Sequence, residues 1–149
     1  MEIERKFLIP RLPKDLHTYP FRLLEQAYLC TEPVVRVRKS DDTYTLTYKS
    51  KGLMSREEYN LPLTAESYEH LKKKADGNII RKKRFRIPHG DGLTIELDVF
   101  DAPFSDLVLA EVEFTSEEQA RAFLPPAWFG EEVTWSAKYH NSTLSRRQV

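Results

Sequence analysis

Short alternating runs of acidic and basic residues are the part of this sequence best suited to chemistry. Glu2, Glu4 and Lys6 are spaced two residues apart, and Glu111 and Glu113 repeat that spacing near the other end of the chain. In an extended strand, residues two apart point to the same face of the sheet. Carboxylates ligate hard divalent cations, and ammonium or guanidinium groups hold phosphate oxygens. The spacing therefore predicts sites for a metal ion and an anion.

Further charged runs have the same period of two, with apolar residues at the alternate positions. A single strand of this kind is ordinary, because an antiparallel sheet often exposes one polar face to water. Recurrence of like-charge pairs in strand after strand favours a closed sheet whose charged face lines the interior, where opposite charges, metal ions or an anion compensate them. The runs are Arg36 with Arg38, Lys49 with Thr45 and Thr47, Arg56 with Glu58 and Asn60, Lys82 with Arg84 and Arg86, and Glu96 with Asp98.

The alternation predicts an α+β fold, namely a closed eight-stranded antiparallel β-barrel (a tunnel) with a few helices packed outside it. Short turns such as Ser40-Asp41-Asp42 and Lys51-Gly52 connect consecutive strands and require antiparallel pairing. The expected strands cover residues 2–9, 22–30, 34–39, 43–50, 55–61, 79–87, 93–100 and 108–114. The expected helices cover residues 64–76 and 115–124, with short helical turns near 13–17 and 136–145.

Composition narrows the class of protein further. The 149 residues and 40% hydrophobic content suit one domain over residues 1–149. Lys plus Arg and Asp plus Glu both number 23, so the chain lacks the basic excess of proteins that bind nucleic acids or anionic membranes. The single Cys30 excludes an internal disulfide, and we find no signal peptide or membrane-spanning run. We therefore expect a cytoplasmic protein.

The ordered set of motifs resembles the CYTH superfamily, the triphosphate tunnel metalloenzymes. Glu2-Ile3-Glu4-Arg5-Lys6 is similar to the Glu-x-Glu-x-Lys signature that opens these proteins. The remaining matches follow in family order across almost the whole chain. They are Gln26-Ala27-Tyr28-Leu29, Val35-Arg36-Val37-Arg38, Thr45-Leu46-Thr47-Tyr48-Lys49, Arg56-Glu57-Glu58-Tyr59, Lys82-Lys83-Arg84-Phe85, Glu96-Leu97-Asp98-Val99-Phe100, Ala110-Glu111-Val112-Glu113, Glu132-Val133-Thr134, Lys138-Tyr139 and Asn141.

The resemblance implies metal-dependent hydrolysis of a triphosphate compound, with inorganic triphosphate, cleaved to pyrophosphate and phosphate, as the favoured substrate. Mg²⁺ or Mn²⁺ would be bound by Glu2, Glu4, Glu111 and Glu113. The phosphate oxygens would be held by Lys6, Arg36, Arg38, Lys49, Lys82 and Arg84, with Lys138 closing the end of the site. Glu111 or Glu113 would orient the attacking water, and Tyr28 beside Lys6 is a candidate base. Supporting roles, as anchors of the basic side chains or as ligands through water, fall to Glu58, Asp98 and Glu96.

The chain departs from the family pattern at two positions and leaves alternative functions open. Asn60 replaces a carboxylate of a usual Glu-x-Glu, and Lys138 stands where many relatives have arginine. Alternatives are a thiamine or nucleoside triphosphatase, a class IV adenylyl cyclase, and a non-catalytic polyphosphate or nucleotide sensor. The expected partners are a small triphosphate and no nucleic acid or membrane, and a homodimer is compatible with the sequence. The four histidines lack metal-ligand spacing, and we expect them to be exposed.

Overall fold

The protein is seen here in a computed structural model, which describes residues 1–148. Nine strands are present where eight were expected, because the segment 55–61 is divided at Glu57. Its first part pairs with the first strand of the chain, and its second part pairs with the fourth. The strands are β1 (Glu2–Leu8), β2 (Phe21–Thr31), β3 (Val34–Ser40), β4 (Thr43–Lys49), β5 (Ser55–Arg56), β6 (Glu58–Pro62), β7 (Asp76–Pro88), β8 (Thr94–Phe100) and β9 (Val108–Phe114).

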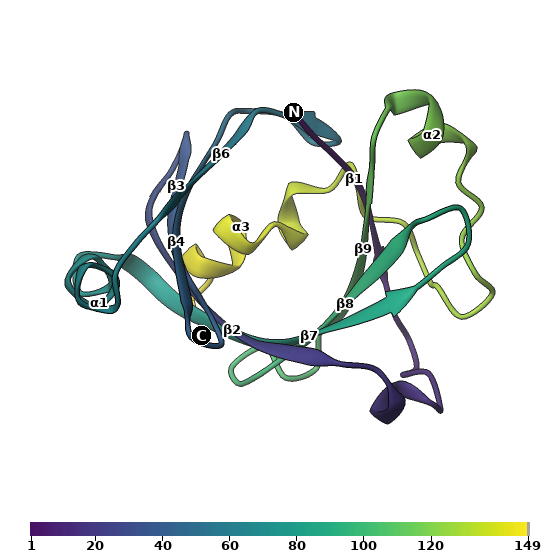
Figure 1. Ribbon diagram of the computed structural model, residues 1–149, viewed down its shortest axis with the longest axis horizontal. Coiled ribbons are helices and arrows are strands. Elements are labelled where there is room, and N and C mark those ends of the chain that lie inside the picture. The colour runs from purple at the N-terminus through teal and green to yellow at the C-terminus, as the bar shows by residue number, and fades with distance from the viewer. Residues whose placement is uncertain (149) are drawn as a thin grey trace.

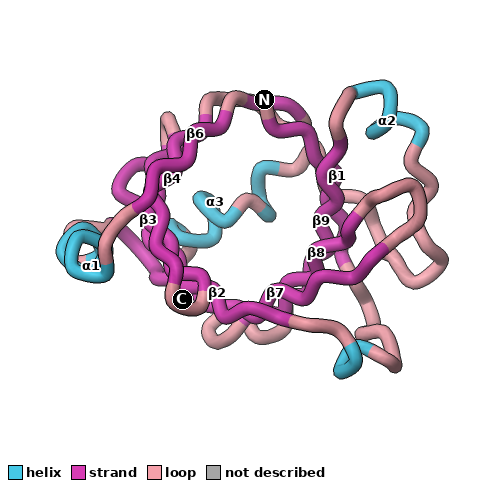
Figure 2. Tube along the Cα trace, in the orientation of Figure 1, coloured by secondary structure: helices cyan, strands magenta, loops and turns pink. Residues whose placement is uncertain are grey.

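All nine strands form one sheet in the order β5-β1-β9-β8-β7-β2-β3-β4-β6, and every neighbouring pair is antiparallel. The sheet curls into a ring, which Figure 1 shows from one end and Figure 2 shows as a magenta tube. Its two edge strands, β5 and β6, are separated by Glu57 alone, so the chain itself spans the seam. The predicted antiparallel barrel is therefore confirmed, as a nearly closed sheet of nine strands and not eight.

Two helices lie outside the ring, as expected. Helix α1 (Ala65–Lys72) begins after Thr64, whose hydroxyl accepts a hydrogen bond from the amide of Ser67. Helix α2 (Glu117–Ala122) begins two residues after the expected start at 115, because the hydroxyl of Ser116 caps it by accepting a hydrogen bond from the amide of Gln119. Both helices end two or more residues before the predicted boundaries.

The apolar faces of the strands point outward and pack beneath these helices. One core lies between α2 and the β1–β9–β8–β7 part of the ring and contains Phe7, Leu97 and Val112. A smaller core lies under α1, where Tyr68 is fully buried. Because these outward faces are apolar, the charged faces of the same strands are turned to the interior.

The third helix, α3 (Asn141–Arg146), corrects the prediction that all helices pack outside. In Figure 1 it crosses the opening of the ring, and it packs against β7 and β2. Leu144 of α3 is fully buried in a third core. This core also contains Ile80, Phe100 and Leu109, which continue the inner faces of β7, β8 and β9. The interior thus changes from charged to apolar where α3 lies, and this end of the barrel is filled.

Glycine at position 77 permits the close approach of α3 to the wall. Gly77 has a φ of 73°, a conformation that residues with a side chain rarely adopt. A Cβ atom there would overlap the carbonyl oxygen of Ser145. Asn78 adds two hydrogen bonds from its Nδ2 atom, to the carbonyl oxygens of Leu144 at 3.1 Å and Arg147 at 2.7 Å. Within residues 1–148, no helix is long and apolar enough to cross a membrane.

Candidate active site

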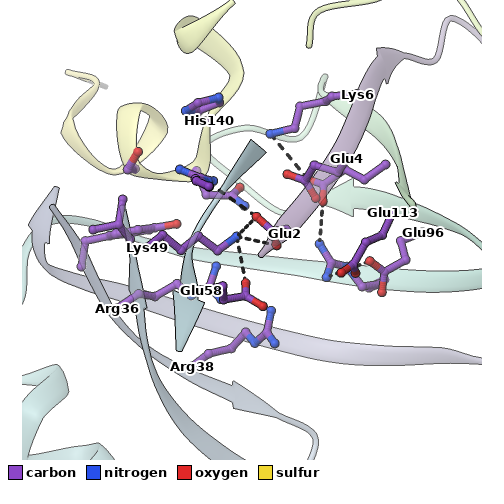
Figure 3. A pocket seen from close by; sticks show the side chains of 17 residues that line it. Glu2, Glu4, Lys6, Arg36, Arg38, Lys49, Glu58, Glu96, Glu113 and His140 are labelled. Atoms are coloured by element: carbon purple, nitrogen blue, oxygen red, sulfur yellow. Dashed lines mark hydrogen bonds and ion pairs between the residues drawn. The ribbon is translucent and has the colours of Figure 1, made fainter. Parts of the chain in front are cut away.

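A cavity of about 150 Å³ occupies the charged part of the interior, and Figure 3 shows the side chains around it. Acidic and basic groups contribute equally to its lining, six of each. The acidic residues are Glu2, Glu4, Glu58, Glu96, Glu111 and Glu113, and the basic residues are Lys6, Arg36, Arg38, Lys49, Arg56 and Arg84. Tyr28, Val34, His140, Asn141 and Ser142 complete the lining. The structure therefore brings together most of the residues that the alternation and the family motifs single out.

The pairing of β1 with β9 determines the acidic side of the cavity. It places Glu4 opposite Glu113 and Lys6 opposite Glu111, and Lys6 Nζ lies 3.7 Å from Glu111 Oε1. Neither Glu4 nor Glu113 has a side-chain hydrogen bond or ion pair within residues 1–148. Burial, reinforced by the neighbouring Glu111 charge, raises the pKa of Glu4 to about 8. Burial and the Glu2 charge also raise the pKa of Glu113.

These carboxylates fit a hard divalent cation. Two unpaired carboxylates that face each other repel, and a proton or a cation relieves the repulsion. No three His, Cys, Asp or Glu side chains of residues 1–148 converge into a complete metal cage. Mg²⁺ suits such a partial donor set, because it commonly binds to one or two carboxylates and completes its shell with water and phosphate oxygens.

Lys49 and Glu2 connect the two sides of the barrel seam. Lys49 Nζ donates to both carboxylate oxygens of Glu2, at 3.0 Å each, and lies 3.3 Å from Glu58 Oε2. Arg56 Nε lies 3.5 Å from the same Glu2 carboxylate. Lys49 belongs to β4 and Glu2 to β1, so this group of charges holds together strands that do not pair directly. It also commits much of the charge of Glu2 to a structural contact.

A fully buried carboxylate, Asp98, orients Arg84. Asp98 accepts hydrogen bonds from Arg84 Nε and Nη2, both at 2.8 Å, and from Lys82 Nζ at 2.6 Å. Burial opposes ionisation of Asp98, but the Arg84 and Lys82 charges outweigh it and hold the pKa below the usual range. Arg84 is thereby directed to the cavity, 3.7 Å from Glu111. Lys82 itself is not among the cavity-lining residues, because its ammonium group is turned to Asp98 and the ring of Phe100.

Two neighbouring guanidinium groups, those of Arg36 and Arg38, have no carboxylate partner within residues 1–148. Arg36 is almost completely buried, and its Nε atom has no hydrogen-bond acceptor. Burial, followed by repulsion from Arg36, lowers the pKa of Arg38 to about 10. Buried unpaired cations are costly unless a counter-ion is supplied. The pair is therefore suited to an anion that enters the cavity.

The C-terminal segment contributes lining residues that the period-two analysis missed. His140, expected on the surface, is half-buried at the cavity, where burial and the Lys6 charge lower its pKa to about 4. Asn141 also lines the cavity, and its buried Oδ1 atom has no hydrogen-bond partner. These residues lie outside any strand, so alternation cannot reveal them. The only available signal was the match of Asn141 to the closing family motif.

Two other expectations can be compared with the positions that the structure gives. Tyr28 is buried and lines the cavity, but it pairs in register with Arg36 on β3 and is not placed beside Lys6 by strand pairing. Lys138 does not reach the cavity. It lies over the ring of Tyr139, 5.3 Å from the centroid, in a shallow surface depression shared with Arg146 and Arg147.

A nearly closed barrel with opposed interior charges defines a tunnel-type protein suited to binding anions together with cations. Residues 1–147 match the CYTH domain, and the chain belongs to the CYTH family. It is 43% identical over 148 residues to the inorganic triphosphatase of Nitrosomonas europaea, covering 97% of this chain and 96% of that protein. It is 34% identical over 153 residues to the inorganic triphosphatase of Acetivibrio thermocellus, with 96% and 92% coverage.

Solved structures show the similarity to known proteins in three dimensions as well. The crystal structure of the inorganic triphosphatase NE1496 superimposes with a TM-score of 0.74 at 38% identity, covering 99% of this chain and 96% of that one. A protein of Pyrococcus furiosus at 20% identity superimposes with a TM-score of 0.63 and shares the fold.

Proposed function

We propose that this chain is a metal-dependent inorganic triphosphatase, which hydrolyses triphosphate to pyrophosphate and phosphate. The observation that carries the proposal is that unpaired basic groups and unpaired carboxylates line the same cavity. In the described part of the chain, Arg36 and Arg38 lack anionic partners, while Glu4 and Glu113 lack cationic ones. A polyphosphate that enters with a divalent cation satisfies both. The two inorganic triphosphatases at 43% and 34% identity support the same substrate.

The basic residues of the cavity would bind the phosphate chain. Arg36, Arg38 and Arg84 present guanidinium groups, which match phosphate oxygens with two parallel hydrogen bonds. Lys6 and Lys49 add point charges, although each is already in contact with a carboxylate. We include Arg56 among the phosphate-binding residues because it also lines the cavity. We assign Lys82 to holding Asp98, and through it Arg84, and we give Lys138 no role in substrate binding.

Glu4 and Glu113 would hold the divalent cation, with Glu2 and Glu111 contributing where Lys49 and Lys6 leave oxygen atoms available. When bound, Mg²⁺ or Mn²⁺ neutralises phosphate charge and lowers the pKa of bound water. Glu111 is the poorer proton acceptor: although burial opposes its ionisation, the Lys6 and Arg84 charges hold its pKa well below the usual range. Glu113 has a more open position, and its carboxylate oxygen that does not hold the cation would orient water and accept a proton.

In the reaction, a water oxygen attacks the terminal phosphorus and gives its proton to Glu113. The bond between that phosphorus and the bridging oxygen breaks, and pyrophosphate leaves with the electron pair. Positioning and charge neutralisation supply most of the catalysis in phosphoryl transfer. Arg36, Arg38 and Arg84 would supply both, because they fix the phosphate chain in line and spread its negative charge over several guanidinium groups.

The direct test is release of phosphate and pyrophosphate from inorganic triphosphate, thiamine triphosphate and ATP, each with Mg²⁺, with Mn²⁺ and with a chelator. We expect metal-dependent release with inorganic triphosphate as the preferred substrate. Cyclic AMP and pyrophosphate from ATP would instead identify an adenylyl cyclase. Tight triphosphate binding without turnover of any substrate would identify a sensor and refute the proposal.

A further inference from the structure

A second cavity adjoins the first on the far side of a thin wall of side chains. This back pocket has a volume of about 240 Å³ and lies between the 31–34 segment, the 50–56 segment and the C-terminal residues from Ala137 to Arg146. The two cavities share part of their lining, so one layer of residues faces both. The shared residues are Val34, Lys49, Arg56, His140 and Ser142.

The back pocket carries an excess of positive charge. Among the residues that the structure describes, Glu32 is its only acidic lining residue, and it is paired with Lys51 at 3.1 Å. Arg146 stands at the outer side of the pocket and forms no ion pair within residues 1–148. Arg56 makes a single long contact with Glu2, at 3.5 Å, and most of its five N–H donors stay available. The pocket therefore offers donors to an anion on both its inner and its outer side.

The wall between the cavities has the chemistry of a phosphate-binding surface. Lys49 and Arg56 are the cations in it, and His140 and Ser142 are the neutral hydrogen-bonding groups. The imidazole of His140 is uncharged near neutral pH, since burial and the Lys6 charge lower its pKa to about 4. A neutral imidazole can still donate one hydrogen bond, so it adds no charge repulsion to this crowded cationic region.

The two sides of α3 have different neighbours. On its β7 side the helix is held by the close contact at Gly77 and by both hydrogen bonds from Asn78. On the side facing β3, β4 and β5 it borders the back pocket. The back pocket thus lies beside α3 and shares lining residues with the active cavity.

We propose that the back pocket is a second phosphate subsite, which shares Lys49 and Arg56 with the active cavity. It takes one phosphoryl group, which comes either from released inorganic phosphate or from the fourth phosphate of a longer linear chain. This inference rests on the proposed function, because it requires the front cavity to hold triphosphate. The group in the back pocket contacts Arg146, which lies outside the active cavity.

The test compares Arg146→Gln with Arg121→Gln, a matched loss of one exposed arginine on α2. One arm measures inhibition of triphosphate hydrolysis by inorganic phosphate, and the other measures kcat/KM for linear tetraphosphate. We expect Arg146→Gln to leave triphosphate kcat/KM unchanged. It should weaken either phosphate inhibition or tetraphosphate turnover by about tenfold, the loss of one charge-assisted hydrogen bond. The affected arm identifies the source of the bound group.

Failure of the subsite and failure of the proposed function give different results. If Arg146→Gln matches wild type and Arg121→Gln in both arms while triphosphate is still hydrolysed, the second subsite is wrong and the triphosphatase assignment stands. If wild-type protein releases no phosphate from triphosphate with either metal, the proposed function itself is wrong. A charge-reversing Arg146→Glu variant should enlarge the effect seen with glutamine, and an unchanged result there would also overturn the subsite.

Discussion

Glu4 and Glu113 lie directly opposite each other on β1 and β9, and neither carboxylate has a side-chain partner within residues 1–148. Like charges placed across a strand pair destabilise the sheet. Glu4 is also partly removed from water, and this burial raises its pKa to about 8. Such a pair weakens the metal-free barrel, and the cation that we propose for Glu4 and Glu113 would relieve the repulsion.

Replacing either carboxylate with its amide should lower the enzymatic activity without lowering the stability of the metal-free protein. Glu4→Gln or Glu113→Gln should lower triphosphatase activity by at least about 100-fold. Loss of a residue that only supports a metal ligand already lowers activity by up to about 100-fold, and these two residues are the proposed ligands themselves. The unfolding free energy of the metal-free protein should stay the same or increase, because the repulsion is removed. Glu57→Gln, an exposed change between β5 and β6, is the matched control. Near-normal activity in both cavity variants would overturn the metal-site assignment.

The raised pKa of Glu4 predicts pH-dependent metal binding. Below pH 8 the buried carboxyl is largely protonated in the metal-free protein, so a cation must displace that proton to bind. The dissociation constant for Mn²⁺ should therefore rise by up to about tenfold per pH unit as pH falls from 8 to 6, the limit for one displaced proton. Calorimetry in buffers of different ionisation enthalpy would measure the proton release directly.

The raised pKa of Glu4 also predicts how the stability of the metal-free protein changes with pH. A carboxyl whose folded pKa is raised stabilises the fold fully below its ordinary pKa of 4.5, and this contribution is lost as pH rises through about 8. Thermal unfolding with chelator present should show that loss between pH 5 and 8.5, and Glu4→Gln should lack it. A metal affinity that is flat over this range, with no proton released, would contradict both expectations.

Asp98 should be the most sensitive charged position for folding. Asp98→Asn leaves Lys82 and Arg84 buried without their shared counter-charge, and breaking a buried pair in this way costs about 3–5 kcal/mol. Urea unfolding would measure the loss. Lys82→Met should cost less, because Asp98 keeps both hydrogen bonds from Arg84. A loss below about 1 kcal/mol for Asp98→Asn, the level of an exposed pair, would show that the interior is more hydrated than the geometry indicates.

Lys138 and Arg38 provide a comparison between the motif-based assignment and the structure. Lys138 matches a family position but lies on the outer surface, whereas Arg38 lines the cavity and has no ion-pair partner among residues 1–148. Lys138→Ala should change kcat/KM by no more than about twofold, as expected for a surface change. Arg38→Ala should lower it by about 100-fold or more, the effect of removing one preorganised donor. A large effect of Lys138→Ala would return this residue to the site.

Alternation could predict the barrel and most of its lining because a strand has only two faces. Once Glu4, Arg36 and Glu111 are assigned to one face, closure of the sheet brings them together without further information. Alternation does not show how far along the barrel axis a side chain lies. Lys82 shares a face with Arg84, yet it lies nearer the apolar end, where Asp98 and Phe100 occupy its ammonium group.

The C-terminal contribution could not be predicted for a different reason. His140 and Asn141 reach the cavity because α3 packs across the end of the ring, and that packing depends on contacts between residues distant in sequence. Leu144 looks like any apolar residue of a short helix until Ile80 and Phe100 are known to face it. Secondary-structure patterns describe local conformation, whereas the docking of α3 depends on tertiary contacts.

Two glycines with nearly the same positive φ allow the docking of α3 to be tested separately from backbone strain. Gly77 and Gly92 have φ values of 73° and 72°, so alanine at either position should cost about 1–2 kcal/mol of backbone strain. A Cβ at Gly92 meets open space, whereas a Cβ at Gly77 collides with the backbone of α3 at Ser145.

Gly77→Ala should therefore destabilise the protein more than Gly92→Ala and should also lower triphosphatase activity, because displacement of α3 moves His140 and Asn141 away from the cavity. Gly92→Ala should retain wild-type kcat/KM at temperatures where both variants are folded. Chemical unfolding and steady-state kinetics on the two variants measure these effects. Equal stability losses with equal activities would mean that α3 can shift without disturbing the site, and that the closed end of the barrel is not required for catalysis.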